Sequence, residues 1–238
     1  MFPLFFHSQI PTSGLLELTG DEAAHAISAV RIAVGEKISL TDGAGVKAEA
    51  VVTNLQKKSL QANVISYEQQ VKSPILLVVA QALTKGDRAR ETIELLTQAG
   101  VDQVIPWAAA RCIGQWKDDA LDKWQGWSKE ATKQSRRSWM PEIHEVVTTT
   151  HLVKKISDFD LTLLFEESAT NKLSEVLSDT KAKSILIIIG PEGGVTPEEA
   201  EAFRAAEAIS VVMGSAVFRS AHAGAAALAA VQTGLKIW

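Results

Sequence analysis

The order of hydrophobic and polar residues divides the chain into two parts with different patterns. Alternating stretches between residues 15 and 66 predict strands over 37–41, 46–53 and 60–65. The Asp42-Gly43 pair favours a tight hairpin turn, and a helical stretch over 21–30 interrupts the strands. This first part is therefore expected to form a small antiparallel β-barrel.

After Pro74 the pattern changes to alternating strands and helices. Apolar runs predict strands over 75–82, 102–107, 161–166, 184–189 and 210–213. Amphipathic or alanine-rich runs predict helices over 87–99, 121–138 and 221–235. The alternation predicts an α/β domain with a parallel sheet, and ligands are expected at the carboxyl ends of its strands. The polar segment 67–73 is the expected boundary, with domains over 1–70 and 73–238.

Composition narrows the function classes. The net charge of -4 gives no overall attraction to nucleic acid, so any RNA binding must come from local groups of cations. Cys112 is the only cysteine, which excludes an internal disulfide and a cysteine-based zinc site and favours a reducing, cytoplasmic setting without a bound metal. No apolar run reaches the length of a membrane span, so no membrane association is expected.

The most informative segment is 189–199, because a strand, a glycine loop and a helix start follow one another within it. Thr196, Pro197 and Glu199 have the spacing of a reciprocal helix cap, which occupies backbone donors that a phosphate needs. Glu192, Glu198 and Glu199 are expected to make the loop acidic. A neutral or cationic ligand is therefore favoured over a nucleotide phosphate.

A second strand ends at a glycine in the segment 211–224. If the strands before Gly190 and Gly214 are neighbours in the sheet, their two loops can enclose a flat ligand between backbone segments. Such junctions are common in α/β proteins, so each one alone is weak evidence for a ligand site.

A basic helix is the expected RNA-binding surface. Lys129, Lys133, Arg136 and Arg137 are spaced to share one helical face beside Trp124 and Trp127. The alternative is a solvated helix whose tryptophans pack in the core, and for the tryptophans this alternative is favoured. Lys85, Arg88 and Arg90 either extend the RNA surface or are ordinary surface charges.

Four segments together resemble the RsmE-type methyltransferases of the SPOUT superfamily. They are GPEGGVTPEE from Gly190, the stretch from Met213 to Arg219, KQSRRS from Lys133 and KGDR from Lys85. The resemblance covers nearly the whole chain. It implies a carboxyl-terminal trefoil-knot domain that binds S-adenosylmethionine and an amino-terminal PUA-like RNA-binding barrel.

The resemblance further implies a homodimer that methylates a uridine at ring position 3 in 16S ribosomal RNA, as naked RNA or in the small subunit. The cofactor-binding positions it implies are Phe165, Glu166, Ile189, Gly190, Pro191, Glu192, Gly193, Gly194, Met213, Gly214, Val217, Phe218 and Ser220. The RNA-binding positions are Arg31, Lys85, Arg88, Lys133, Arg136 and Arg137.

The sequence departs from the family pattern at two places. Ala221 stands where members often carry glutamate, and Leu4 stands where they tend to carry arginine. Arg219 is the expected catalytic residue, with Arg136 or Arg137 as alternatives, because a cation near the uracil carbonyl oxygens stabilises the anion left by deprotonation. His222 has a suitable intrinsic pKa for a base, but a structural role is favoured for it. The missing acid leaves an alternative open, a catalytically inactive RNA-binding module of the same fold.

Overall fold

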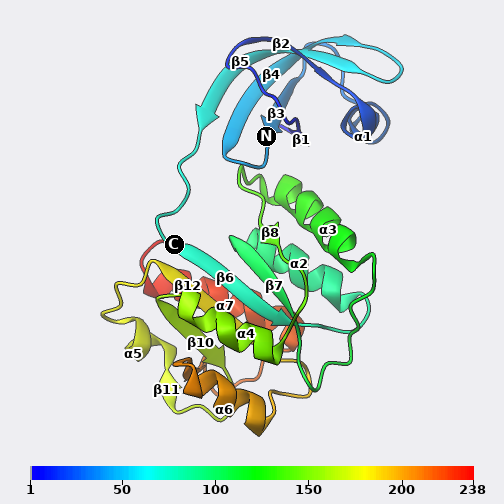
Figure 1. The fold of residues 1–238 in the computed structure, drawn as a ribbon. Helices are drawn as coiled ribbons and strands as arrows, with labels where there is room; N and C mark the ends of the chain where they lie inside the picture. Colours follow the sequence, from blue (N-terminus) through cyan, green and yellow to red (C-terminus); the bar gives the residue numbers. More distant parts are fainter. Residues whose placement is uncertain (1) are drawn as a thin grey trace. The chain divides into compact units, whose positions relative to one another are not determined.

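The computed structural model describes residues 2–238 and divides them into two compact units (Figure 1). The first unit contains residues 2–72 and Thr132–Met140, and the second contains Ser73–Ala131 and Pro141–Trp238. The division after Lys72 falls inside the polar segment expected to be the boundary. The inclusion of residues 132–140 in the first unit was not expected from the sequence.

The first unit is built on a five-stranded sheet. Its strands are β1 (Leu4–Phe6), β2 (Gly14–Leu18), β3 (Lys37–Thr41), β4 (Val46–Leu55) and β5 (Leu60–Gln69), in the order β1-β3-β4-β5-β2. The strands within the predicted range 15–66 pair in antiparallel fashion, as expected, and the additional strand β1, which was not predicted, pairs with β3 in parallel. The helix α1 (Gly20–Ala24) and the π-helical segment η1 (His25–Val30) replace the single helix expected there.

Residues 138–140 join the first unit through the turn between β3 and β4. The Ser138 carbonyl accepts hydrogen bonds from Gly45 N at 2.9 Å and Thr41 Oγ1 at 3.2 Å. Gly45 has a φ of +106°, and a Cβ on it would lie 2.5 Å from the Trp139 ring. Only glycine satisfies both the backbone angle and the close approach.

The second unit is an α/β domain with an eight-stranded parallel sheet, which confirms the expected fold class. Its strands follow the order β11-β13-β10-β12-β6-β7-β8, and β9 also pairs with β7. They are β6 (Leu76–Ala82), β7 (Gln103–Ala108), β8 (Glu142–Ile143), β9 (Val147–Thr148), β10 (Leu161–Phe165), β11 (Asn171–Lys172), β12 (Ser184–Ile189) and β13 (Ile209–Val212).

Helices cover both faces of this sheet. Leu77, Val79 and Ile187 belong to one core, and Val78 and Ile188 belong to the other, because successive side chains of a strand point to opposite faces. The first face carries α2 (Arg88–Gln98), α5 (Leu173–Leu177) and α7 (Ser220–Gly234), and the second carries α4 (Thr149–Lys155) and α6 (Pro197–Ala205) (Figure 1). The remaining helical elements are η2 (Ile156–Asp158) and α3 (Ala120–Ser135).

The alanine-rich helix α7 packs closely on its own sheet. A Cβ on Gly224 would lie 2.9 Å from Gln81 Oε1 and 3.0 Å from Leu96 Cδ2. The small residues of α7 therefore bring its backbone against β6 and α2. None of the helices described over residues 2–238 is both long and apolar enough to cross a membrane. The trefoil knot implied by the resemblance stays a prediction.

Candidate cofactor and RNA sites

Three parallel strands of the second unit end at the same edge of the sheet. Phe165, the last residue of β10, lies opposite Ile189 of β12 and Val211 of β13. The expectation that the strands before Gly190 and Gly214 are neighbours was wrong, because β10 lies between them. The site therefore has three loops, and the segment beginning at Glu166 is the middle one.

The glycine loop after β12 is held in a fixed shape. A Cβ on Gly190 would lie 2.7 Å from Val195 Cγ2, so the loop closes tightly on itself. Gly194 has a φ of +72°, and its N–H donates to the Pro191 carbonyl at 2.9 Å. Arg111, which the sequence analysis missed, donates to the Gly193 carbonyl at 3.1 Å.

The predicted helix cap at the end of this loop is confirmed. Glu199 N donates to Thr196 Oγ1, and Thr196 N donates to Glu199 Oε2 at 3.1 Å. The other oxygen of Glu199 accepts hydrogen bonds from Ala110 N at 2.9 Å and from Thr149 Oγ1 at 2.8 Å. Through these hydrogen bonds Glu199 holds three segments together. Glu199 is only 6% exposed, so the expectation that it contributes to an acidic entrance was wrong.

Glu198 remains exposed beside the loop. A hydrogen bond from its own backbone N–H, followed by the bond from Thr196 Oγ1, lowers the pKa of its carboxyl, so the group is negatively charged at neutral pH.

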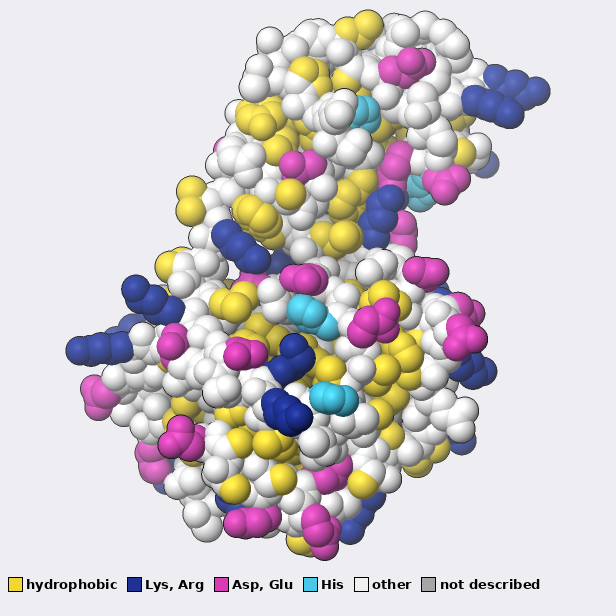
Figure 2. Space-filling model, in the orientation of Figure 1, with side chains coloured by type: hydrophobic (Ala, Val, Ile, Leu, Met, Phe, Trp, Pro, Cys, Tyr) yellow, Lys and Arg dark blue, Asp and Glu magenta, His cyan; other side chains and the backbone are white. Residues whose placement is uncertain are grey.

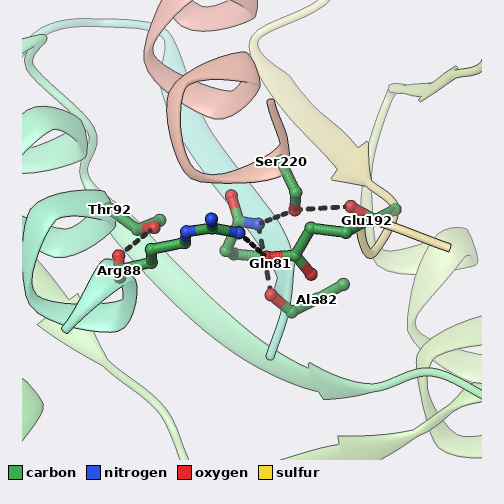
Figure 3. A network of polar contacts seen from close by, with 7 residues as sticks. Gln81, Ala82, Arg88, Thr92, Glu192 and Ser220 are labelled. Atoms are coloured by element: carbon green, nitrogen blue, oxygen red, sulfur yellow. Dashed lines mark hydrogen bonds and ion pairs between the residues drawn. The ribbon is translucent and has the colours of Figure 1, made fainter. Parts of the chain in front are cut away.

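Two more carboxylates of the site have arginine partners. Glu192 Oε1 lies 3.5 Å from Arg88 Nη1 at the start of α2, and Glu166 Oε1 lies 3.1 Å from Arg204 of α6. Figure 3 shows Arg88 and Glu192 facing each other. The glycine loop is thus less acidic than its sequence indicates, since the charge of Glu192 is balanced.

A chain of hydrogen bonds links β6, α7 and the glycine loop (Figure 3). Gln81 Nε2 donates to Ser220 Oγ at 3.2 Å, and Ser220 Oγ donates to the Gly190 carbonyl at 2.7 Å. Gln81 is fully buried, and its Oε1 has no hydrogen-bond partner among the described residues. Sequence reasoning missed Gln81, although a glutamine inside an otherwise apolar strand is itself a signal.

The loop after β13 offers an open, partly apolar surface. Val217 is 65% exposed and Phe218 is 49% exposed, while nothing would lie within 4 Å of a Cβ on Gly214. Arg219 is exposed at the amino-terminal cap of α7. Exposed apolar side chains beside accessible backbone suit a nucleoside that also offers polar groups, so these residues fit the adenosine of S-adenosylmethionine.

His222 and Ala221 follow at the start of α7. His222 Nε2 lies 3.0 Å from Glu91 Oε1 of α2, which joins the two helices and supports the structural role favoured for His222. Ala221 is 2% exposed, so the position at which family members often carry glutamate packs in the interior here.

The prediction that four basic residues share one face of a single long helix was wrong. The helix α3 ends at Ser135, and Arg136 follows with a φ of +58°, so the predicted register does not continue to Arg137. Lys133 is buried and its Nζ lies 3.5 Å from Glu22 Oε1 within the first unit, so it supports the fold there.

Four of the other expected RNA contacts are exposed, and Arg137 is partly buried. The exposed ones are Arg31, Lys85, Arg88 and Arg136. On the face of each unit visible in Figure 2, cationic and acidic side chains are interspersed, and no extended surface of one sign is seen. RNA bound on these visible faces would therefore contact small groups of cationic residues, as the net charge indicates.

Comparisons with known proteins define the class. The chain matches the family described as an RNA methyltransferase domain over residues 71–232 and the RNA methyltransferase PUA domain over residues 18–65. The fold and these matches are those of an RNA methyltransferase with a PUA domain.

Relatives then specify the family. The chain is 35% identical to ribosomal RNA small subunit methyltransferase E of Mycobacterium bovis, over 96% of this chain and 90% of the relative. It is 29% identical to the Bacillus subtilis protein of that name, over 94% and 91% of the two chains. The solved Neisseria gonorrhoeae protein of that name, bound to S-adenosyl methionine, has a TM-score of 0.88 and 25% identity over 98% of each chain. The chain belongs to the ribosomal RNA small subunit methyltransferase E family.

Proposed function

We propose that this protein transfers the methyl group of S-adenosylmethionine to ring position 3 of a uridine in small-subunit ribosomal RNA. The observation that carries the proposal is the meeting of three loops at the ends of β10, β12 and β13. They combine open glycine backbone with the exposed apolar side chains of Val217 and Phe218. A phosphate is a poor ligand for this site, because the capping box occupies donors at the start of α6.

The cofactor residues divide into two sets. Gly190–Gly194 and Phe165–Glu166 supply backbone groups and carboxylates for the polar end, and Met213, Gly214, Val217 and Phe218 supply the surface for the adenosine. When bound, S-adenosylmethionine supplies an electrophilic methyl group. Ser220 fixes the position of the Gly190 carbonyl, which keeps the glycine loop in register with the loop after β13.

Arg219 is the residue that acts on the RNA base. Deprotonation of N3 leaves negative charge on the two carbonyl oxygens of uracil, and an exposed guanidinium at the start of α7 stabilises that charge. Arg219→Ala is expected to lower kcat by about 100-fold or more. The Kd for S-adenosylmethionine, measured by calorimetry, stays within about threefold because the charge stabilisation acts on the RNA. Unchanged turnover would remove Arg219 from the mechanism.

The partner and its setting follow from the family. The substrate is small-subunit ribosomal RNA, naked or assembled, and the active form is a cytoplasmic homodimer. Light scattering on the purified protein measures the oligomeric state. Mass spectrometry of ribosomal RNA from cells that lack the protein identifies the target, and the expected result is the loss of one 3-methyluridine.

Calorimetry also separates this function from that of an inactive RNA-binding module. Binding of S-adenosylmethionine supports the methyltransferase. RNA binding without any cofactor binding supports the module, which the replacement of an acidic residue by Ala221 makes conceivable.

A further inference from the structure

A pocket lies at the carboxyl edge of the sheet, apart from the three loops of the proposed cofactor site. Its volume is about 350 Å³, and it lies between the loop after β6, the segment 113–117 and the start of α3. Its lining contains none of the residues of 190–194 or 213–218. Ala89 lines it, and the adjacent Arg88 pairs with Glu192, so the first turn of α2 connects the pocket to the glycine loop.

One wall of the pocket is aromatic. Trp124 is 4% exposed and meets Trp116 edge to face, with ring centroids 5.1 Å apart, so its position is fixed by the core. Trp127, one helical turn later, is only half-buried and also lines the pocket. The accessible part of an indole beside polar groups is a surface on which a flat ring stacks.

The rim of the pocket carries an excess of positive charge. Lys85, Lys117 and Lys123 line it together with a single carboxylate, Asp119. Lys123 Nζ lies 2.6 Å from Asp119 Oδ2, and this contact lowers the pKa of the Asp119 carboxyl, so that pair is charged and mutually balanced. Lys85 and Lys117 remain to attract an anion.

Two backbone segments that line the pocket are in close contact. A Cβ on Gly114 would lie 2.4 Å from the Thr84 carbonyl oxygen. The loop after β6 and the segment 113–117 therefore hold Lys85 and Lys117 on a fixed frame.

We propose that this pocket binds one unpaired nucleotide of the RNA substrate, with its base against Trp127 and its phosphate between Lys85 and Lys117. A stacking surface and two cations together match a flat, anionic ligand, and the volume lies within the range of small-ligand sites. An unpaired nucleotide is the better ligand at this position, because a paired base must first give up its pairing and stacking before it reaches an indole. The inference rests on the proposed function only in taking this RNA to be the methylation substrate.

Fluorescence anisotropy with a labelled, unstructured oligouridylate tests the pocket in the full chain. Trp127→Ala is expected to weaken binding by at least about fivefold, and Trp127→Phe, which keeps a ring, by no more than about twofold. Lys85→Ala and Lys117→Ala are each expected to lower the slope of log affinity against log salt by about 0.7. Lys183→Ala, an exposed lysine just before β12, is the matched control and leaves binding unchanged.

The outcomes separate the pocket from the proposed function. The Kd for S-adenosylmethionine stays within about twofold in all these variants, because the pocket is not the cofactor site. One outcome is that the wild type fails to bind S-adenosylmethionine while the variants still show the expected loss of RNA affinity. The methyltransferase proposal then fails, and the proposal of a nucleotide-binding pocket is retained. The pocket proposal is overturned if the folded lysine variants, Trp127→Phe and Trp127→Ala all bind RNA with the affinity of the wild type. The assignment to an unpaired RNA nucleotide is overturned if the variants lose as much affinity for duplex RNA as for the oligouridylate. It is also overturned if the protein binds free uridine monophosphate more tightly than the oligomer.

Discussion

The Ser220 hydroxyl donates a hydrogen bond of 2.7 Å to the Gly190 carbonyl and thereby ties the first residue of α7 to the first residue of the glycine loop. The same oxygen accepts from the buried Gln81 side chain, so one hydroxyl connects a central strand with two loops of the proposed cofactor site. The shape of the site thus depends on a contact between residues that no local sequence pattern relates.

Removal of that hydroxyl is expected to weaken cofactor binding. Ser220→Ala leaves Gln81 Nε2 with one partner fewer and frees the Gly190 carbonyl, at a cost of about 1–3 kcal/mol in the free energy of unfolding. We expect the Kd for S-adenosylmethionine to rise by about fivefold or more, as measured by calorimetry. Ser220→Thr keeps the hydroxyl and is the control. An unchanged Kd in Ser220→Ala would show that the bond does not position the loop.

Gly190 is expected to tolerate no side chain unless the side chain of Val195 is made smaller as well. Its Cβ would lie 2.7 Å from Val195 Cγ2, so Gly190→Ala must displace the loop. The single variant is expected to lose cofactor affinity, and the double variant with Val195→Ala is expected to regain most of it. Val195→Ala alone is the control. Equal loss in the single and double variants would contradict the steric explanation.

Glu199 is expected to be a stability determinant. In Glu199→Gln the new NH₂ group must face some of the three donors that now bind the carboxylate, Ala110 N, Thr149 Oγ1 and Thr196 N. A buried donor then lacks an acceptor, and the free energy of unfolding in urea is expected to fall by about 2–3 kcal/mol. Glu201→Gln, on the exposed side of the same helix, is expected to stay within about 1 kcal/mol of the wild type. Similar losses in both variants would refute the special role of Glu199.

Lys133 and Arg136 are expected to separate stability from RNA binding. Lys133→Met removes the cation that lies 3.5 Å from the Glu22 carboxylate, whose side chain is 13% exposed, and is expected to cost about 3 kcal/mol of stability. Arg136→Ala is expected to leave stability within about 0.5 kcal/mol and to weaken RNA binding. Thermal unfolding and RNA anisotropy measure the two effects. If Lys133→Met loses RNA affinity but keeps the stability of the wild type, Lys133 contacts RNA and does not support the fold.

Asp160 is expected to make stability depend on pH at the opposite edge of the sheet. Hydrogen bonds from the Lys183 backbone N–H, and then from Ser184, lower the pKa of its carboxyl below the ordinary value of 3.8. A lowered pKa in the folded state stabilises fully above the unfolded pKa, and this contribution is lost as the pH falls through the folded pKa. The stability difference between wild type and Asp160→Asn should therefore be largest near neutral pH and disappear in strong acid. A difference that does not change with pH would rule out the charge as its source.

The sequence by itself determined the elements that depend on near neighbours. The capping box of Thr196 and Glu199 and the strand 184–189 appear in the structure as predicted, because a cap and a periodicity involve residues only a few positions apart. The family resemblance added the identification of the first part as a PUA domain, which composition and periodicity alone do not reveal.

Only the tertiary structure decided which strands are neighbours and which charges have partners. The position of β10 between β12 and β13, the burial of Lys133 and the balanced charge of Glu192 depend on residues far apart in the sequence. Gln81 and Ser220 meet across 139 residues. Hydrophobic patterning selects a buried face but does not specify its partner, so packing of the whole chain is needed to place such contacts.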